Sequence, residues 1–175
     1  MKNQVFGWHF VGSTLRDGSP VPRDGKWLRH NGPIKMCFSG LHGSLEPFDA
    51  LTYAPGNTLC YCEFKTDIEY ASDKLVCRER KILYRMDASE LLRYFARMQA
   101  LSVVDLWNPP QVVLDYLMTG DECIRTTAWG AARGAARAAA WEAARDAARA
   151  AARADFNSLV YECFGLETKR MGPVK

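Results

Sequence analysis

The feature that most constrains the fold is an alanine-rich run, AWGAARGAARAAAWEAARDAARAAARADF, at residues 128–156. Alanine has the highest intrinsic helix propensity, so the run predicts one long helix from about residue 121 to about residue 157. A large side chain recurs at every fourth position, in the series Trp129, Arg133, Arg137, Trp141, Arg145, Arg149 and Arg153. Because a helix has about 3.6 residues per turn, this series winds around the helix and forms no straight basic face.

Three interpretations of this helix stay open. It packs on its own domain, or its alanine surface and tryptophans form a homo-oligomer contact. Alternatively its arginines attract nucleic-acid phosphates, for which the sequence gives a weak pattern without a base-reading motif. Arginine and tryptophan dominate binding hot spots. The predicted binding residues are therefore Arg133, Arg137, Arg145, Arg149, Trp129 and Trp141.

The first 86 residues have a different pattern, in which glycine, proline and aspartate interrupt short apolar pieces. The pieces QVFGWHFV, KWLR and IKMCF suit short strands joined by turns. TLCYCEFKTDIEY alternates as a strand does, with Leu59, Tyr61 and Glu63 on one face and Cys60, Cys62 and Phe64 on the other. KLVCRERKILYRM predicts a further strand or a hairpin pair. This half is predicted to be a bent, β-rich structure.

Helical spacing replaces alternation after Met86, and residues 87–120 predict two helices that end near Thr119 and Gly120. The fold class expected is α+β, with a β-rich N-terminal part and packed C-terminal helices. Short linkers favour a single domain over residues 1–175, organised as 1–86, 87–120, the long helix 121–157 and a tail 158–175.

The composition favours a globular chain, because 48% of the residues are hydrophobic and 25% are charged. No apolar run approaches the ~18 residues of a membrane span, and the N-terminus MKNQVFGWHF lacks the layout of a signal peptide. We therefore expect a cytosolic protein without membrane contact. The six cysteines form no C-x-x-C pair, so free buried thiols are expected, and no metal site.

The segment SGLHGSLEPFDALTYAPGN, residues 39–57, is the candidate functional loop. It is either a binding or catalytic loop, or a strand end at His42, a helix capped by Ser44 and a Pro-Gly turn. The chain has no phosphate-binding loop, no H-E-x-x-H and no G-x-S-x-G motif. Common enzyme motifs therefore do not define a reaction.

A resemblance covers nearly the whole chain and is carried by GWHFVGSTLRDG, GLHGS, FDALTYAPGN, DKLVCRERKI, LLRYFAR and YLMTGDE before the Ala-Arg-Trp run. The sequence resembles a family of unknown function encoded by bacteriophages and mobile elements. The resemblance implies a phage accessory protein in the bacterial cytosol. The leading hypothesis is a non-enzymatic protein that binds a host protein or complex and inhibits a defence system. A virion or assembly protein that oligomerises through the long helix is the alternative.

The chain also resembles ADP-ribosyltransferases in the order of WHFVGS, GLHGSLEPFDALTYA and a following strand that carries Glu63. That resemblance implies an NAD-using enzyme with His9, Ser13, His42, Ser44, Tyr53 and Glu63 as catalytic residues. His9 and Ser13 would hold the ribose, Tyr53 would stack on nicotinamide, and Glu63 would stabilise the oxocarbenium-like ribose. If the chain is not an enzyme of this kind, no cofactor is expected. Glu63 is then an exposed carboxylate near Lys65, and His9 a hydrogen-bonded histidine in a half-buried strand.

Overall fold

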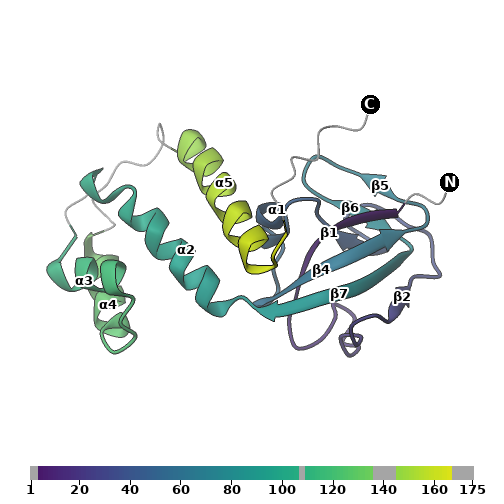
Figure 1. Cartoon of the computed structure of the whole chain (residues 1–175), viewed down its shortest axis with the longest axis horizontal. Helices are drawn as coiled ribbons and strands as arrows, with labels where there is room; N and C mark the ends of the chain where they lie inside the picture. Colours follow the sequence, from purple (N-terminus) through teal and green to yellow (C-terminus); the bar gives the residue numbers. More distant parts are fainter. Residues whose placement is uncertain (1–3, 107–108, 136–144, 167–175) are drawn as a thin grey trace. The chain divides into compact units, whose positions relative to one another are not determined.

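The computed structural model describes residues 4–106, 109–135 and 145–166. Antiparallel strands fill the N-terminal half and helices follow, which confirms the α+β class (Figure 1). The chain divides into two compact units. The first comprises residues 1–89 and 156–175, and the second comprises residues 90–155. Each unit is described by itself.

The first unit is built on a four-stranded antiparallel sheet. Its strand order is β1 (Gln4–Val11), β4 (Thr58–Lys65), β7 (Glu79–Asp87) and β2 (Trp27–Arg29). His9 pairs with Cys60 and Trp8 pairs with Tyr61 across β1 and β4. Paired residues of an antiparallel sheet share a face. The predicted alternation along β4 is therefore confirmed.

A second, three-stranded sheet has the order β3 (Leu41–Gly43), β6 (Leu75–Cys77) and β5 (Glu69–Tyr70). Backbone hydrogen bonds between Trp8 and Ser44, at 2.7 and 2.9 Å, link the end of β3 to β1. Gly43 lies against the ring of Phe64, so that any larger residue there would collide with it. The two sheets therefore approach closely where β3 crosses β1.

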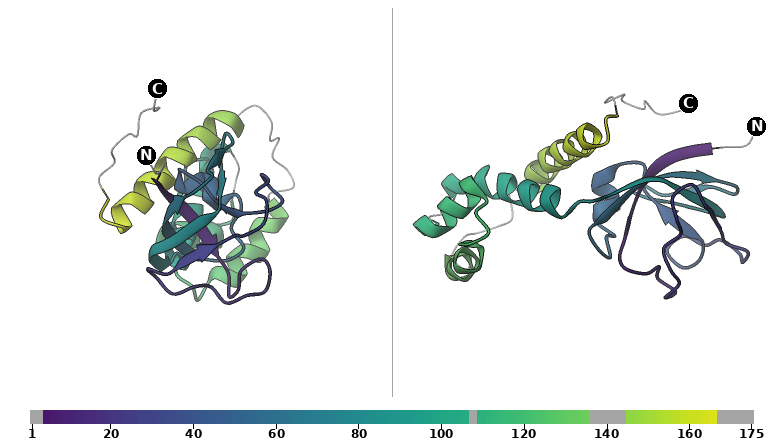
Figure 2. Two further views of the ribbon diagram at one scale, coloured as in Figure 1. Left: turned by 90° about the vertical axis from the view of Figure 1, so that its right-hand side faces the viewer. Right: turned by 60° about the horizontal axis from the view of Figure 1, so that its bottom comes forward.

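The predicted strand at residues 34–38 is wrong, because these residues form a tight turn. Lys35 and Ser39 exchange backbone hydrogen bonds across it, and Cys37 has a positive φ of 67°. The turn lies in the connection between β2 and β3, among the dark purple and blue loops below the strands in the right-hand view of Figure 2. A positive φ is rare in strands, so the apolar letters of IKMCF gave a misleading pattern.

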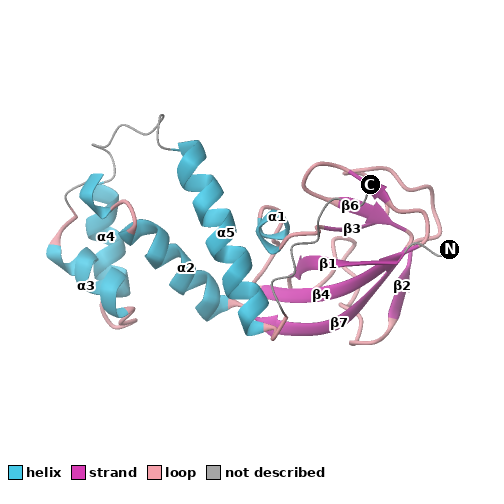
Figure 3. Cartoon of the chain, turned by 45° about the horizontal axis from the view of Figure 1, so that its top comes forward, coloured by secondary structure: helices cyan, strands magenta, loops and turns pink. Residues whose placement is uncertain are grey.

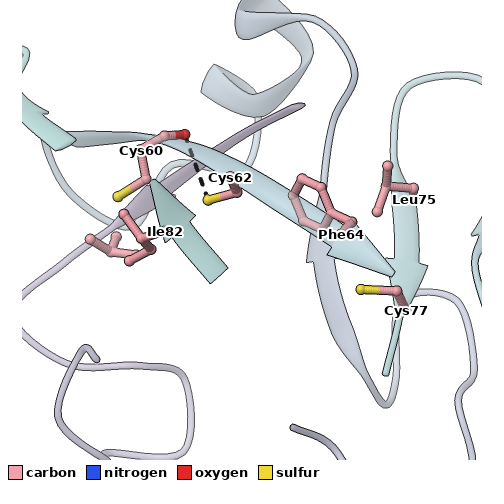
Figure 4. Packing of buried hydrophobic residues seen from close by; sticks show 7 residues of the cluster. Cys60, Cys62, Phe64, Leu75, Cys77 and Ile82 are labelled. Atoms are coloured by element: carbon pink, nitrogen blue, oxygen red, sulfur yellow. Dashed lines mark hydrogen bonds between the residues drawn. The ribbon is translucent and has the colours of Figure 1, made fainter. Parts of the chain in front are cut away.

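The core of this unit contains three free thiols. Cys60, Cys62 and Cys77 are buried with Phe64, Leu75, Ile82 and Val11 (Figure 4). Burial raises the pKa of Cys60 and Cys77 to about 11 and that of Cys62 to about 12. They are therefore neutral packing groups at physiological pH. The expectation of buried thiols is right for these three and wrong for Cys37, Cys123 and Cys163, which are exposed.

The other face of the sheet packs against the short helix α1 (Pro47–Leu51) and the end of α5 (Arg145–Cys163). Phe156 and Val160 are fully buried. Trp8 contacts the rings of Tyr161 and Phe164, with centroids 5.8 and 4.9 Å away. The residues after 155 are thus part of the same core as β1.

The second unit is helical. It contains α2 (Ser89–Leu101, whose first residue is assigned to the first unit), the short 3-10 helix η1 (Val104–Leu106), α3 (Gln111–Thr119) and α4 (Arg125–Ala135). Figure 3 shows α3 and α4 side by side, and Val113, Leu117 and Ala128 form their buried contact. Gly120 ends α3 in the left-handed conformation, with φ at 70°. The two helices predicted between residues 87 and 120 are confirmed.

The boundaries predicted for the long alanine helix need correction. Helix begins at Arg125, because Glu122, Cys123 and Ile124 form a turn in which the Asp121 side chain accepts from the Cys123 N–H at 2.8 Å. It ends at Cys163, because Phe156 and Val160 continue the apolar face beyond Asn157. Residues 136–144, between α4 and α5, lie outside the described residues. Among the described helices, none has the length and apolar character to cross a bilayer.

Candidate functional site

A cavity of about 1000 Å³ opens within the first unit, between the end of β1, the loop after it and the segment around β3. Segments far apart in the sequence meet in its wall. The lining residues are 8–17, 28–30, 37–44, Ala50, Tyr53, Pro55, Lys74 and Arg80. Four of the lining side chains carry positive charge, namely Arg16, Arg29, Lys74 and Arg80, whereas Asp17 is the one acid.

Arg80 is the buried cation of this cavity. It lies on β7 across from Phe64 on β4 and Leu28 on β2, so its side chain projects from the interior face of the sheet. Only 5% of the residue is exposed. Its Nη1 donates to the carbonyl oxygen of His42 at 2.6 Å. Among the described residues, no carboxylate pairs with it.

The surroundings of Arg80 are unusual for a charged group. Burial lowers the pKa of Arg80, and only the cysteines Cys62, Cys77 and Cys60 oppose this shift, with no carboxylate among the groups that do so. A guanidinium has five N–H donors, and one hydrogen bond uses only one of them. None of the remaining guanidinium nitrogens is both buried and without a hydrogen bond. Because Arg80 is part of the cavity lining, these donors are accessible from the cavity. Arg80 can therefore donate to a ligand.

His9 is the cavity histidine with free ring nitrogens. It is half-buried on β1, and it has no hydrogen-bond partner among the described residues. Burial lowers its pKa well below the usual value, and the positive charge of Arg80 lowers that pKa further. The strand position is half-buried as expected, but the hydrogen bond expected for His9 is not formed with any described residue.

His42, by contrast, is fully engaged in local structure. Its Nε2 accepts a hydrogen bond from the Cys37 N–H at 3.0 Å, which leaves the ring proton on Nδ1. Nδ1 then donates to the Gly40 carbonyl oxygen at 3.2 Å. Both ring nitrogens hold the turn that precedes β3, so His42 has no free nitrogen for proton transfer.

His30 has a similar structural role. Ser39 Oγ donates to the Pro33 carbonyl oxygen at 2.6 Å, so it accepts from His30 Nε2 at 3.0 Å. Nε2 also lies 3.3 Å from the Pro33 oxygen. His30 therefore ties the loop after β2 to the turn before β3.

Two exposed aromatic rings also line the cavity. Phe38 is 76% exposed and Tyr53 is 48% exposed. The ammonium of Lys35 lies 4.7 Å from the Phe38 ring centre, and that of Lys74 lies 4.2 Å from the Tyr53 ring centre. Lys74 also donates to the Tyr53 hydroxyl at 2.8 Å, and that hydroxyl donates to Asp73. Aromatic surface and positive charge are thus combined at these positions.

Five of the six residues expected for a transferase site line this cavity: His9, Ser13, His42, Ser44 and Tyr53. Glu63 does not join them. It pairs with Phe6 across β1 and β4, so it projects from the face opposite His9. Its carboxylate forms an ion pair with Lys81 at 2.5 Å and is 8% exposed. The prediction of an exposed Glu63 near Lys65 is also wrong, because Lys81 on the neighbouring strand covers it.

The 39–57 segment is a strand end, a helix and a turn, as one of its two interpretations predicted. Ser44 does not cap the helix, because its backbone pairs with Trp8. Glu46 occupies the capping position without a side-chain bond to the helix. Asn157 supplies the capping oxygen to the Phe48 N–H instead.

The residues predicted to bind through the alanine-rich helix are only partly described. Trp129 on α4 is 64% exposed, and Arg149 on α5 is exposed. Arg133 lies in α4 and Arg145 in α5. Arg137 and Trp141 lie outside the described residues.

Arg80 is the residue of the candidate site that the sequence analysis did not identify. KLVCRERKILYRM was predicted to form a strand or a hairpin pair with no role for Arg80, whereas β7 begins at Glu79 and includes Arg80. The available signal is that Arg80 lies two positions before Ile82, on the same face of an alternating strand. Within the described residues, no three histidine, cysteine or acidic side chains come close enough to hold a metal ion.

The class defined so far is an α+β chain with a cationic cavity in its β-rich unit. Residues 5–94, just over half of the chain, match the model of a domain of unknown function, DUF7666. The chain belongs to that family. Except for Gln4, the first residue of β1, the matched region contains all the strands, and it contains every residue that lines the cavity. No curated protein and no solved structure matches the chain.

Proposed function

We propose that the β-rich unit is a binding module that takes an anionic ligand into its cavity, with Arg80 as the anchoring cation. The observation that carries this proposal is the burial of Arg80 without a carboxylate partner in the described chain. A buried charge without an ion-pair partner lowers the stability of the fold by several kcal/mol. Such a charge at a cavity wall therefore favours a functional role, in which a bound anion neutralises it.

The other charged side chains of the lining also favour an anionic ligand. Arg29 is neutralised by Glu79 at 2.7 Å, and Lys74 lies 3.8 Å from Asp73. Arg16 has no ion-pair partner among the described residues. Arg16 and Arg80 therefore give the cavity a positive potential, which attracts anions and repels cations.

Calorimetric titration of the full chain with inorganic phosphate, sulfate and acetate tests the proposal. Binding should be lost in Arg80→Met and weakened in Arg80→Lys, because lysine keeps the charge but loses the guanidinium fork. Arg85→Met is the matched control, since Arg85 lies on the same strand, pairs with Asp24 and is not part of the lining. Thermal unfolding of each variant checks that it folds. The absence of any anion binding by the wild-type chain would overturn the proposal.

A second candidate function concerns the helices. We propose that the chain is a phage-encoded accessory protein that binds a host protein or complex, and that it inhibits a host defence system. The exposed Trp129 and Arg149 favour a protein contact, because arginine and tryptophan are the commonest anchors of interfaces. The phage context rests on the resemblance of the sequence. Pull-down of one defined host complex, lost on Trp129→Ala and Arg149→Glu, tests it.

Two alternatives predict different outcomes. Self-association in virion assembly predicts an oligomer, so a monomer in light scattering at high concentration would contradict it. The NAD-using transferase hypothesis gains no support from Glu63, which projects from the face opposite His9. It predicts that the chain transfers label from NAD to a protein of a host lysate, and it fails if no label is transferred.

A further inference from the structure

Resting on the proposed function, we infer that the anionic ligand is a nucleotide, whose phosphate binds at Arg80 and His9 and whose base stacks on Tyr53 or Phe38. Four observations carry this inference: the free donors at Arg80, the free nitrogens of His9, the exposed aromatic rings in the same wall, and the size of the cavity.

The donors suit a phosphate. Arg80 offers a planar fork that matches phosphate oxygens with two parallel hydrogen bonds. The neutral imidazole of His9 has one N–H donor, and no described residue occupies it. A phosphate monoester has three terminal oxygens, so it can accept hydrogen bonds from both side chains and leave an oxygen for another cation of the lining, such as Arg16.

The aromatic rings suit a base. Tyr53 and Phe38 both border the cavity and remain largely exposed, although such rings normally gain by burial. Each ring is also paired with a lysine. Aromatic faces beside positive charge are the usual combination in proteins that bind single nucleotides or unpaired strands, because every base has a face that stacks.

The cavity also has room for a ligand larger than an inorganic anion. Sites for small organic ligands have volumes of roughly 300–1000 Å³. This cavity, at about 1000 Å³, leaves room for a sugar and a base next to an anion held by Arg80. A ligand that bound only through its phosphate would leave the aromatic wall in contact with water.

Calorimetry with four probes tests the inference: inorganic phosphate, ribose 5-phosphate, adenosine and adenosine 5′-monophosphate. The monophosphate should bind at least about tenfold more tightly than ribose 5-phosphate, the factor expected for one stacked base. Adenosine should bind more weakly than the monophosphate, because it lacks the group held by Arg80. Guanosine, cytidine and uridine monophosphates should bind within about tenfold of one another.

Variants separate the two ends of the site. One of the two variants Tyr53→Leu and Phe38→Ala should weaken monophosphate binding and leave ribose 5-phosphate binding unchanged, which identifies the ring that stacks. If neither variant weakens it, the inference is overturned. Tyr84→Leu is the control, since Tyr84 is 66% exposed but is not part of the lining. His9→Leu, which removes the N–H donor, should weaken binding of all phosphate-bearing probes. His9→Asn and His9→Gln keep an amide N–H donor, so they check whether the loss follows the hydrogen bond.

The outcomes distinguish the two proposals. If ribose 5-phosphate binds as tightly as the monophosphate, the nucleotide inference is overturned and the anion-binding function remains. If no probe binds, both fail. Tighter binding of a 5′-phosphorylated oligonucleotide than of the monophosphate would support the inference, with the nucleotide being the end of a strand.

Discussion

The side chain of Asn157 caps a helix that lies 109 residues earlier in the chain: its Oδ1 accepts a hydrogen bond from the backbone N–H of Phe48 at 2.9 Å. The amide nitrogen of Asn157 donates to Glu46 Oε2, also at 2.9 Å. The Tyr161 hydroxyl donates to the same carboxylate at 2.8 Å. The start of α1 and the end of α5 are thus joined by polar contacts above the Trp8 core.

Replacing this cap should destabilise the first unit. We expect Asn157→Ala to lower the free energy of unfolding by about 1–2 kcal/mol, because the Phe48 N–H and the Glu46 carboxylate both lose a partner. Urea unfolding measures the change. Ser158→Ala, on an exposed neighbouring position, should have almost no effect. Equal stability of the two variants would show that Asn157 does not act as a cap.

Stability should depend on the protonation of two histidines. The pKa of His9 is lowered mainly by burial and then by Arg80, and the pKa of His42 is lowered mainly by burial. The folded state therefore binds fewer protons than the unfolded state when the pH falls below about 6.5. Their contribution is fully present above that pH, and it is lost as the pH falls toward the lowered folded pKa values.

Unfolding experiments between about pH 7.5 and pH 5.5 check this dependence. The slope of stability against pH should be shallower in His9→Gln, which cannot titrate and breaks no hydrogen bond to a described residue. His42→Gln should also flatten the slope, but with a loss of stability at high pH, because the Cys37 N–H loses its acceptor. An unchanged slope in both variants would contradict the assignment.

The six thiols should divide into two groups by reactivity. Cys37, Cys123 and Cys163 are exposed, whereas Cys60, Cys62 and Cys77 are buried. A thiol reagent at about pH 8 should therefore modify three groups in the native chain and six after denaturation. Cys123 should react more slowly than Cys37, since the Asp121 carboxylate raises the pKa of Cys123. Rapid reaction of all six groups would show that the core is open.

Glu63 should matter for stability and not for ligand binding. Glu63→Gln weakens the pairing with Lys81 on a neighbouring strand, so we expect a loss of about 1–3 kcal/mol in unfolding free energy. Phosphate binding should be unchanged, because Glu63 projects away from His9. If labelled NAD modifies a protein in a host lysate and Glu63→Gln alone abolishes it, the transferase hypothesis gains and this prediction fails.

Local patterns predicted the features that depend on neighbouring residues. Alternation assigned Cys60, Cys62 and Phe64 to one face, and the Thr119-Gly120 pair located the end of α3. The turn at residues 34–38 was missed because the His42 side chain holds it. The helix cap was misassigned to Ser44 because its true partner, Asn157, is distant in the sequence.

The candidate site was also predicted only in part, because it depends on residues that are distant in the sequence. The sequence identified His9, Ser13, His42, Ser44 and Tyr53, and the fold brings these five to one cavity. It could not assign their roles, since those depend on which nitrogens are already occupied. Arg80 was missed because a charged residue on a strand is normally assumed to face water.

Residues 156–166 follow the helical unit in the sequence, but they pack in the first unit. The matched region of the family ends at residue 94, yet Phe156 and Val160 are fully buried and Tyr161 packs against Trp8. Residues 90–155 are, in topological terms, an insertion between two parts of one domain. Two polypeptides cut within that insertion should still associate without a covalent bond. Such fragment complementation would make the helical unit exchangeable while the cavity is preserved.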